Sequence, residues 1–391
     1  MRIVHTADWH LGKIWKNRSR MDESRRVLDH LARYVREEKC DLLLMAGDLF
    51  DTPNPGGEAE DLVLEFFHRL HEARVPAAVI AGNHDSPVRL DAWSRLTRLA
   101  GVHVVGQPKS ATNGGVLEIP TRSGETAIVA ALPFASPGVF LSALELQAGL
   151  GGAMSRYSAA FSGAVLHLAS RFRPECVNLL MAHTQLDGAI LSNSERQAHL
   201  GDDWAATPQA IPSTAQYVAL GHIHKPQRVE SAPAPTEYCG SPLQLDFGEA
   251  GQEKSFVVVD VKPGRPAQVN RVRVEGGTPL VDLRLTMAEL TQRESELRQA
   301  GWLRLTLLLD QPDPNLARTV MDQFPQAVQV RLELPHAPET EVPRSREGRS
   351  PLDLYRQFHL ERHSVSPELA VEDAFQDLYR TCEENPCVPS A

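Results

Sequence analysis

The first hundred residues alternate between short apolar runs and segments with helical spacing. Strands are predicted at 2–6, 41–47 and 76–82, and helices at 21–38, 58–73 and 88–100. A regular strand–helix alternation gives parallel strands in one sheet with helices covering its faces. The apolar runs are nearly continuous, so this sheet should be buried on both sides. The pattern therefore predicts an α/β fold.

Strands become more frequent after residue 102. They are predicted at 126–134, 176–183, 216–222 and 254–261, with one long helical segment at 140–172. A boundary near 275–282 precedes a small unit of three strands and two helices. Residues 336–350 are Pro-rich and charged, which is typical of a linker. Two short amphipathic helices follow, each opened by Ser-Pro. We therefore predict a first domain at 1–278, a small α+β domain at 279–335, a linker at 336–350 and a helical tail at 351–386.

Composition limits the class of protein. A chain of 391 residues suggests two or three domains, and 42% hydrophobic residues can form a sizeable core. No apolar run is long enough to span a membrane, and the N-terminus lacks the apolar region of a signal peptide, so export is not expected. The five cysteines are odd in number and form no CxxC pair. This favours a reduced, cytoplasmic protein over a disulfide framework or a structural zinc site.

Charge is distributed unevenly along the chain. The formal net charge of −10 argues against a protein that coats nucleic acid by bulk electrostatics. The segment 11–20, however, carries four cations and no acidic residue. These cations are Lys13, Lys16, Arg18 and Arg20.

Polar side chains stand where the predicted strands end. They are Asp8, His10, Asp48, Asn83, His84, His183, His222 and His224. In α/β sheets, ligands collect just outside the carboxyl ends of parallel strands, so these side chains should build one shared site. In an extended segment residues i and i+2 point the same way, which should pair Asp8 with His10 and His222 with His224. Glycines before Asp48 and Asn83 permit the close backbone approach that such a site needs.

Carboxylate, carboxamide and imidazole groups together suit a divalent ion, with Mn²⁺ the best fit and Fe²⁺ and Zn²⁺ as alternatives. These candidate ligands exceed the number that one ion normally takes from protein, which argues for two ions. Such a pair, about 3.5–4 Å apart, can hold a hydroxide and clamp the attacking and leaving oxygens of a phosphoester. Asp48 is the natural bridging ligand. A single histidine at a strand end is more often structural, but five such motifs in order make that interpretation weak.

The ordered pattern "DWH…GD…GNHD…H…GHIH" resembles the calcineurin-like metallophosphoesterase superfamily. More narrowly, "HTADWHLG", "AGDLFDTPNP", "AGNHDSP", "YVALGHIHKPQ" and "GSPLQLDFGE" resemble the family of bacterial SbcD nuclease subunits. The resemblance is strong over residues 1–262 and continues more weakly through the rest of the chain. It implies a four-layer α-β-β-α sandwich with a small α+β capping domain and a C-terminal helical tail.

The resemblance also implies roles for individual residues. One metal ion would be held by Asp8, His10, Asp48 and His224, and the other by Asp48, Asn83, His183 and His222. His84 would stand beside the phosphate as a general acid or as a stabiliser of developing charge. Asp51 would orient His84, and Asp85 would brace the turn. Cys239 stands where the family pattern has Ser, and the loop at 200–207 departs from that pattern.

DNA is the substrate that the resemblance implies. The family acts as a double-strand 3′–5′ exonuclease and a single-strand or hairpin endonuclease in DNA repair, recombination and replication, together with an SbcC-type ATPase. The four cations of segment 11–20 could neutralise backbone phosphates there, or form an ordinary solvated loop.

Two interaction surfaces are hypotheses. The helices at 58–73 and 88–100 carry the apolar side chains Leu62, Phe66, Phe67, Leu70, Trp93 and Leu96. These side chains would pack either against a second copy of the chain, since the resemblance implies dimerisation in this region, or into the core. The tail helices carry Leu352, Tyr355 and Phe358 on one face, and Val371, Phe375 and Leu378 on another. Such a tail resembles a helix-in-groove binder of the ATPase coiled coil, with folding back onto the body as the alternative.

Two other functions stay open. A phosphoesterase acting on a nucleotide or another small phosphoester would share every metal ligand. The basic segment, the unit after residue 280 and the helical tail favour the nuclease. A non-catalytic DNA-end-binding scaffold would not need His84 beside the metal ligands.

Overall fold

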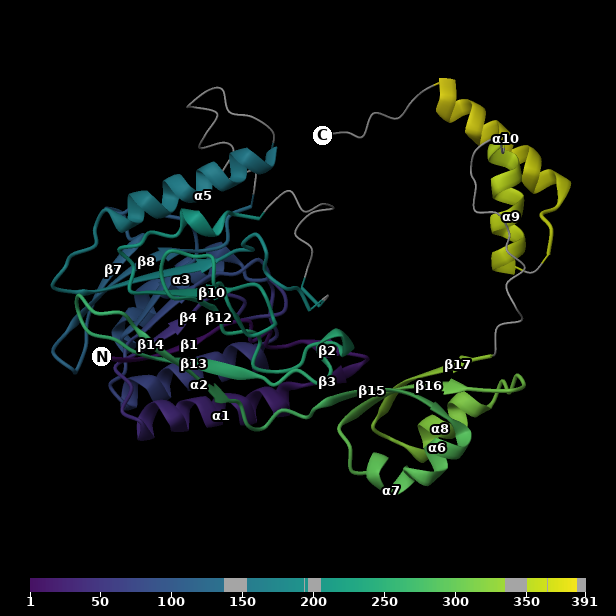
Figure 1. The fold of residues 1–391 in the computed structure, drawn as a ribbon, viewed down its shortest axis with the longest axis horizontal. Helices are drawn as coiled ribbons and strands as arrows, with labels where there is room; N and C mark the ends of the chain where they lie inside the picture. The colour runs from purple at the N-terminus through teal and green to yellow at the C-terminus, as the bar shows by residue number, and fades with distance from the viewer. Residues whose placement is uncertain (137–152, 193, 196–204, 335–349, 364, 385–391) are drawn as a thin grey trace. The chain divides into compact units, whose positions relative to one another are not determined.

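The computed structural model describes residues 1–136, 153–192, 194–195, 205–334, 350–363 and 365–384. The chain divides into two compact units, Met1–Leu334 and Pro335–Ala391 (Figure 1). Four predicted segments fall partly or almost wholly outside the described residues. These are the start of the helix at 140–172, the first part of the loop at 200–207, positions 364 and 385–386 of the helical tail, and the linker at 336–350, of which only Ser350 is described.

Two six-stranded sheets form the body of the first unit. One has the order β14-β13-β1-β4-β5-β6 and the other the order β11-β12-β10-β9-β8-β7. The first contains β1 (Arg2–Thr6), β4 (Leu42–Met45), β5 (Ala77–Ile80), β6 (Val102–Val105), β13 (Ser255–Asp260) and β14 (Gln268–Arg273). The second contains β7 (Val116–Pro120), β8 (Thr126–Leu132), β9 (Val177–His183), β10 (Tyr217–Gly221), β11 (Gln227–Arg228) and β12 (Thr236–Tyr238). Strands β1, β4, β5 and β6 run parallel to one another, as do β8, β9, β10 and β12.

The two sheets pack face to face with helices outside them. Helices α1 (Met21–Glu37), α2 (Gly57–Glu72) and α3 (Pro87–Thr97) cover the first sheet, and α5 (Ala153–Ala169) covers the second (Figure 1). Side chains alternate along each strand, as the pleat requires. In β1, Ile3 lies in the core between the sheets and Val4 lies under the helices. The predicted four-layer α-β-β-α architecture is confirmed.

Most of the apolar residues considered for a dimer surface belong to the core. Leu62, Phe66, Phe67 and Leu70 are only 1–2% exposed and pack against the first sheet. Leu96 differs, because 74% of its surface is exposed near the end of α3. The helical spacing of α2 therefore reflects packing within the chain.

A small α/β unit follows β14. Its three strands, β15 (Leu280–Thr286), β16 (Trp302–Leu308) and β17 (Ala327–Glu333), run parallel. Between them lie α6 (Met287–Gln292), α7 (Glu294–Leu297) and α8 (Leu316–Gln323). Leu303, Leu305 and Leu307 alternate along β16 and are fully buried in the core of this unit. One face of the sheet is thus covered by its own helices.

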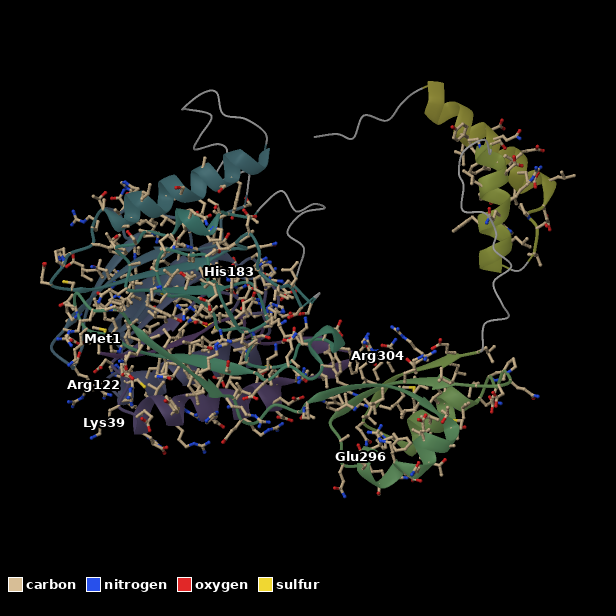
Figure 2. The ribbon with its side chains drawn as sticks, viewed as in Figure 1. Met1, Lys39, Arg122, His183, Glu296 and Arg304 are labelled. Carbon is tan, nitrogen blue, oxygen red and sulfur yellow. The ribbon has the colours of Figure 1, made fainter. Side chains whose placement is uncertain are left out.

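Aromatic and cationic side chains connect the small unit to the body. Trp302 donates from its indole Nε1 to Glu23 Oε1 of α1, over 3.0 Å. The Arg18 guanidinium lies 4.8 Å from the centre of the Trp302 ring. Arg304, labelled in Figure 2, extends over Phe247 of the body with 4.6 Å between guanidinium carbon and ring centre. Stacked cations of this kind stabilise a contact where one partner remains partly hydrated.

The second unit contains two helices, α9 (Pro351–His363) and α10 (Leu369–Glu384). Tyr355 and Phe375 stack with ring centroids 4.3 Å apart and an angle of 11° between their planes. Arg356 donates from Nε to Glu372 across the same pair of helices, over 2.8 Å. The helices therefore form a hairpin. Among the helices that the structure describes, none combines the length and apolar character needed to cross a membrane.

Candidate metal centre

The carboxyl ends of five strands meet at one edge of the sandwich. The loops after β1 and β4 are joined by main-chain bonds from Asp8 N to Gly47 O, 2.9 Å, and from His10 N to Asp48 O, 3.1 Å. The loop after β10 is joined to them because His222 N donates to Asp8 Oδ1, 2.9 Å. The structure thus brings the predicted side chains from both sheets into one buried cluster.

The backbone at this edge is unusual. Asp8, His10, Asp48 and His222 have φ angles of 53°, 47°, 54° and 95°. Non-glycine residues rarely adopt this left-handed region, and they do so mainly where the surrounding structure holds them for function. The expectation that Asp8 and His10, or His222 and His224, alternate on an extended segment was wrong. Left-handed turns direct these side chains instead.

Two glycines are required by close contacts in the centre. A Cβ added at Gly47, which has φ +96°, would lie 2.3 Å from His183 Nδ1. A Cβ added at Gly82 would lie 2.1 Å from Asp48 Oδ1. A side chain at either position would therefore displace a candidate ligand.

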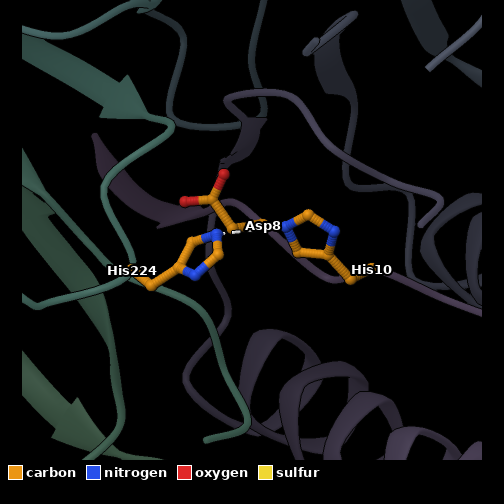
Figure 3. Close-up of side chains that lie close together, drawn as sticks. All are labelled: Asp8, His10 and His224. Carbon is orange, nitrogen blue, oxygen red and sulfur yellow. Dashed lines mark hydrogen bonds between the residues drawn. The ribbon is translucent and has the colours of Figure 1, made fainter. Parts of the chain in front are cut away.

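Asp8, His10 and His224 form the first half of the centre (Figure 3). The His10 and His224 Nε2 atoms are 3.2 Å apart. Their Nδ1 atoms face carboxylates, with His10 Nδ1 at 3.3 Å from Asp51 Oδ1 and His224 Nδ1 at 3.2 Å from Glu249 Oε1. A carboxylate can only accept, so Nδ1 of His224 carries the proton and its Nε2 lone pair faces His10, whose Nδ1 forms no hydrogen bond among the described residues. Asp8 Oδ2 is buried nearby with no hydrogen-bond partner among the described residues. These converging lone pairs fit a cation.

His183, His222, Asn83 and Asp48 form the second half. His183 Nδ1 lies 2.8 Å from Ala46 O and must donate to it, which leaves Nε2 as the ligand atom. That Nε2 faces Asn83 Oδ1 at 2.9 Å and Asp48 Oδ2 at 3.5 Å. Asn83 Oδ1 is also 2.9 Å from His222 Nδ1. Oxygen and nitrogen acceptors converge here as well, which is the chemistry of a second cation site.

The ionisation of these groups follows from burial and mutual charge. Burial lowers the pKa of His183, but the adjacent carboxylates of Asp48 and Asp8 outweigh it and raise the pKa to about 9. Burial raises the pKa of Asp48, yet the charges on His183 and His10 hold it far below its usual range. Burial and the charge on His183 lower the pKa of His222 to about 3. In the metal-free centre, a proton on His183 therefore balances part of the negative charge of Asp48 and Asp8, as a bound divalent ion would.

Residues 1–226 match the family model described as calcineurin-like phosphoesterase. The chain is 40% identical to the SbcD subunit of the SbcCD nuclease of Bacillus subtilis over 282 residues, covering 72% of this chain and 71% of that protein. The chain belongs to the SbcD family of calcineurin-like phosphoesterases. It is 31% identical to the Rhodobacter capsulatus member over 85% of this chain and 86% of that protein. Against the Escherichia coli K12 member, identity is 28% over 96% of this chain and 92% of that protein. The donor set of this family member fits divalent metal ions.

His84 of this phosphoesterase stands at the edge of the centre, half-buried. Its main-chain N–H donates to Asp48 Oδ1 over 2.8 Å, and its Nδ1 donates to the main-chain oxygen of Asp51 over 2.8 Å. A His84 ring nitrogen lies within 4.8 Å of ligand atoms of His10 and Asp48. Burial is the largest influence on His84 and lowers its pKa. The neutral ring therefore carries its proton on Nδ1 and presents Nε2 as a lone pair.

Asp51 contacts His84 through its main-chain oxygen, while its side chain lies beside Lys13 and His10. Its carboxylate lies 3.0 Å from Lys13 Nζ and 3.3 Å from His10 Nδ1, and its main-chain oxygen accepts the hydrogen bond from His84 Nδ1. Burial opposes ionisation of Asp51, but its bonds to His10 and Lys13 lower its pKa to about 2. The Asp51 carboxylate therefore lies beside His10, one of the candidate metal ligands.

Asp85 braces the turn, as predicted. Its carboxylate accepts from the main-chain nitrogens of Leu49, Phe50 and Gly82, at 3.2, 3.0 and 2.9 Å. These bonds tie the loop after β4 to the loop after β5. Burial and the charge of Asp48 raise the Asp85 pKa to about 6.

Segment 11–20 contains a two-stranded hairpin, β2 (Ile14–Trp15) and β3 (Arg18–Ser19), and its four cations have different surroundings. Lys16 is exposed at its tip, and Lys13 is half-buried beside Asp51. Arg20 is only 3% exposed and is paired with Glu23. Arg20 therefore offers no exposed guanidinium to a phosphate, which contradicts its predicted contact with DNA.

A group of residues behind His224 was not predicted from the sequence. Glu249, Lys254 and Ser241 are buried there, and Ser194 reaches them from the loop after β9. The stretch "GSPLQLDFGE" contributed only to the family resemblance. The pairing of Glu249 with Lys254 had no signal in the spacing, since ionised side chains five residues apart outside a helix predict no contact.

Proposed function

We propose that this protein is a metal-dependent DNA nuclease that hydrolyses phosphodiesters and works with an SbcC-type ATPase. The observation that carries the proposal is the convergence of imidazole lone pairs and buried carboxylates beside His84. The relatives, which are named as subunits of the SbcCD nuclease, support DNA as the substrate and SbcC as the partner.

Two divalent ions, which we propose to be Mn²⁺, would bind in the two halves of the centre. Asp8, His10, Asp48 and His224 would hold one ion, and Asp48, Asn83, His183 and His222 the other. When bound, such ions activate water as a nucleophile and neutralise charge on the phosphate. Mn²⁺ suits a site that mixes carboxylate, amide and imidazole donors without a thiolate.

His84 would act on the leaving oxygen of the scissile phosphodiester. With its proton on Nδ1 held by the Asp51 carbonyl, the neutral ring has Nε2 free. An approaching anionic phosphate favours the doubly protonated ring, whose Nε2–H can donate to the developing charge. The chain thus holds the proton donor in place through a main-chain bond.

Lys13, Lys16 and Arg18 are proposed DNA-backbone contacts. Lys13 lies beside the centre, Lys16 is exposed at the hairpin tip, and exposed Arg18 lies next to the small unit. Phosphate contacts of this kind position a duplex without reading its sequence. The basic segment would therefore contribute to affinity for any duplex end.

The nuclease is proposed to act in the cytoplasm as a homodimer bound to the ATPase through its tail. Exposed Val88, Leu96 and Leu99 on and after α3 support a dimer surface, at 69%, 74% and 80% exposure. Leu352, Phe358 and Leu378 are the proposed ATPase contacts, and Tyr355 and Phe375 support them by holding the helical hairpin together. Deletion of residues 350–391 should abolish ATPase binding but leave Mn²⁺-dependent cleavage of simple substrates. A monomer in sedimentation at micromolar concentration would exclude the dimer.

End-labelled linear duplex and hairpin DNA, incubated with Mn²⁺ or EDTA, test the activity. The wild type should cleave both DNAs only with Mn²⁺, and His84→Gln should lose most of this cleavage. His103→Gln, which changes a half-buried histidine of β6 outside the centre, is the matched control and should cleave normally. Turnover of a small phosphodiester without cleavage of any DNA, even with the ATPase present, would favour a small-substrate phosphoesterase. Binding of DNA ends without any turnover would favour a scaffold.

A further inference from the structure

A buried ion pair stands directly behind His224. Glu249 is fully buried, Lys254 is 7% exposed, and their charged groups are 2.5 Å apart. Burying two ionised side chains costs several kcal/mol per ion unless further hydrogen bonds stabilise them. Neither residue belongs to the apolar clusters that pack between and around the two sheets. The pair therefore calls for a functional explanation.

The Glu249 carboxylate reaches the imidazole of His224 in two ways. Its Oε1 lies 3.2 Å from His224 Nδ1. It also accepts a short hydrogen bond from the Ser194 hydroxyl, whose oxygen is 2.8 Å from the same Nδ1. Both contacts require Nδ1 to carry the proton. The tautomer and the orientation of the ring are thereby fixed, with Nε2 directed at His10.

Lys254 holds both the carboxylate and the backbone that carries the histidine. Besides Glu249, its Nζ donates to the His224 main-chain oxygen at 2.9 Å and to Ser241 Oγ at 3.1 Å. Ser241 Oγ is in turn 3.2 Å from Glu249 Oε2. The ammonium group thus fixes the position of the residue at the backbone, while the carboxylate fixes the ring.

We propose that Glu249 and Lys254 form a positioning pair that orients His224 and sets its affinity for a divalent ion. A carboxylate on the remote nitrogen of a metal-binding histidine aligns the ring and makes the other nitrogen more basic. Loss of such a partner typically weakens metal binding by about 10–100-fold. The pair acts on one half of the centre, because, in the part of the chain that the structure describes, its contacts reach His224 and not the residues around Asn83. The inference rests on the metal centre of the proposed function.

Calorimetric titration of metal-free, full-length protein with MnCl₂ tests this inference. Glu249→Gln should weaken one of two Mn²⁺ binding events by about 10–100-fold and leave the other unchanged. Glu237→Gln is the matched control, since Glu237 is also buried at 4% exposure and is paired with Arg271 outside the centre. It should bind both ions as the wild type does.

A second readout separates positioning from a general loss of structure. DNA cleavage by Glu249→Gln should recover toward the wild-type rate at high Mn²⁺ concentration, whereas His84→Gln should not recover. If Glu249→Gln does not fold, the double substitution Glu249→Met with Lys254→Met removes both charges and leaves no unpaired buried ion.

A folded Glu249→Gln or double variant that binds two Mn²⁺ ions with wild-type affinity would overturn the inference alone. A wild-type protein that binds no Mn²⁺ would overturn the metal centre together with it.

Discussion

Replacing Gly82 by alanine should damage the metal centre by moving Asp48. The new Cβ would lie 2.1 Å from Asp48 Oδ1 and 2.4 Å from its main-chain nitrogen, while real Cβ contacts stay above 3.0 Å. Relief of both contacts requires a shift of about 1 Å. A misplacement of about 1 Å in a reacting group can cost about 100-fold in rate. Overpacking a well-packed site also costs about 1–3 kcal/mol of unfolding free energy.

Turnover of a chromogenic phosphodiester with Mn²⁺ measures the effect on rate, and calorimetry measures Mn²⁺ affinity. Gly82→Ala should lose about 100-fold in kcat and bind at least one ion more weakly. The matched control is Gly163→Ala in α5, where an added Cβ meets nothing within 4 Å. It should gain about 0.5–1 kcal/mol of stability and keep full activity. If Gly82→Ala keeps wild-type turnover and affinity, the assignment of Asp48 as a ligand to both ions is refuted.

Three further results are expected. Because contact with Asp48 contributes to raising the pKa of metal-free His183 to about 9, Mn²⁺ binding should release a proton and tighten as pH rises from 7 to 9. Calorimetry in buffers of different ionisation enthalpy detects this release, and a pH-independent affinity would contradict it. Trp302→Ala should cost about 3 kcal/mol in thermal unfolding and speed proteolysis of the small unit, and unchanged protection would argue against its anchoring role. Tyr355→Ala should cost about 1 kcal/mol by removing the stack on Phe375, which circular dichroism of the isolated tail would register as lost helicity.

The family of this chain could be recognised from the order of the polar residues that follow its strands. Apolar runs predicted the strands β1, β4, β5, β8, β9, β10 and β13, and each predicted end lies within two residues of the observed end. Shorter strands could not be predicted in this way. The strand β12 has three residues and β11 has two, which is too few for a period-2 pattern to stand out. The parallel arrangement of the small unit also had no sequence signal beyond its order of strands and helices.

Within the centre, residue types and order could be predicted, but the contacts could not. Asp51 illustrates the limit, since its side chain lies against Lys13 and His10 while its main-chain oxygen holds His84. A sequence indicates which groups a loop carries, and the φ angles of the loop decide where each group points. Arg20 shows the same limit, because a cation in a basic segment is here buried against Glu23.

The α/β class, the set of candidate ligands and the resemblance to a family could all be inferred without coordinates, because periodicity and residue chemistry are local properties. The folded chain was needed to show which candidate ligand atoms converge, which glycines leave no room for a side chain, and which cations are buried. It also revealed Glu249 and Lys254 behind His224. Contacts such as those of Gly82 with Asp48 and of Glu249 with His224 join segments far apart in the sequence at the ends of the two sheets, and no local pattern encodes that meeting.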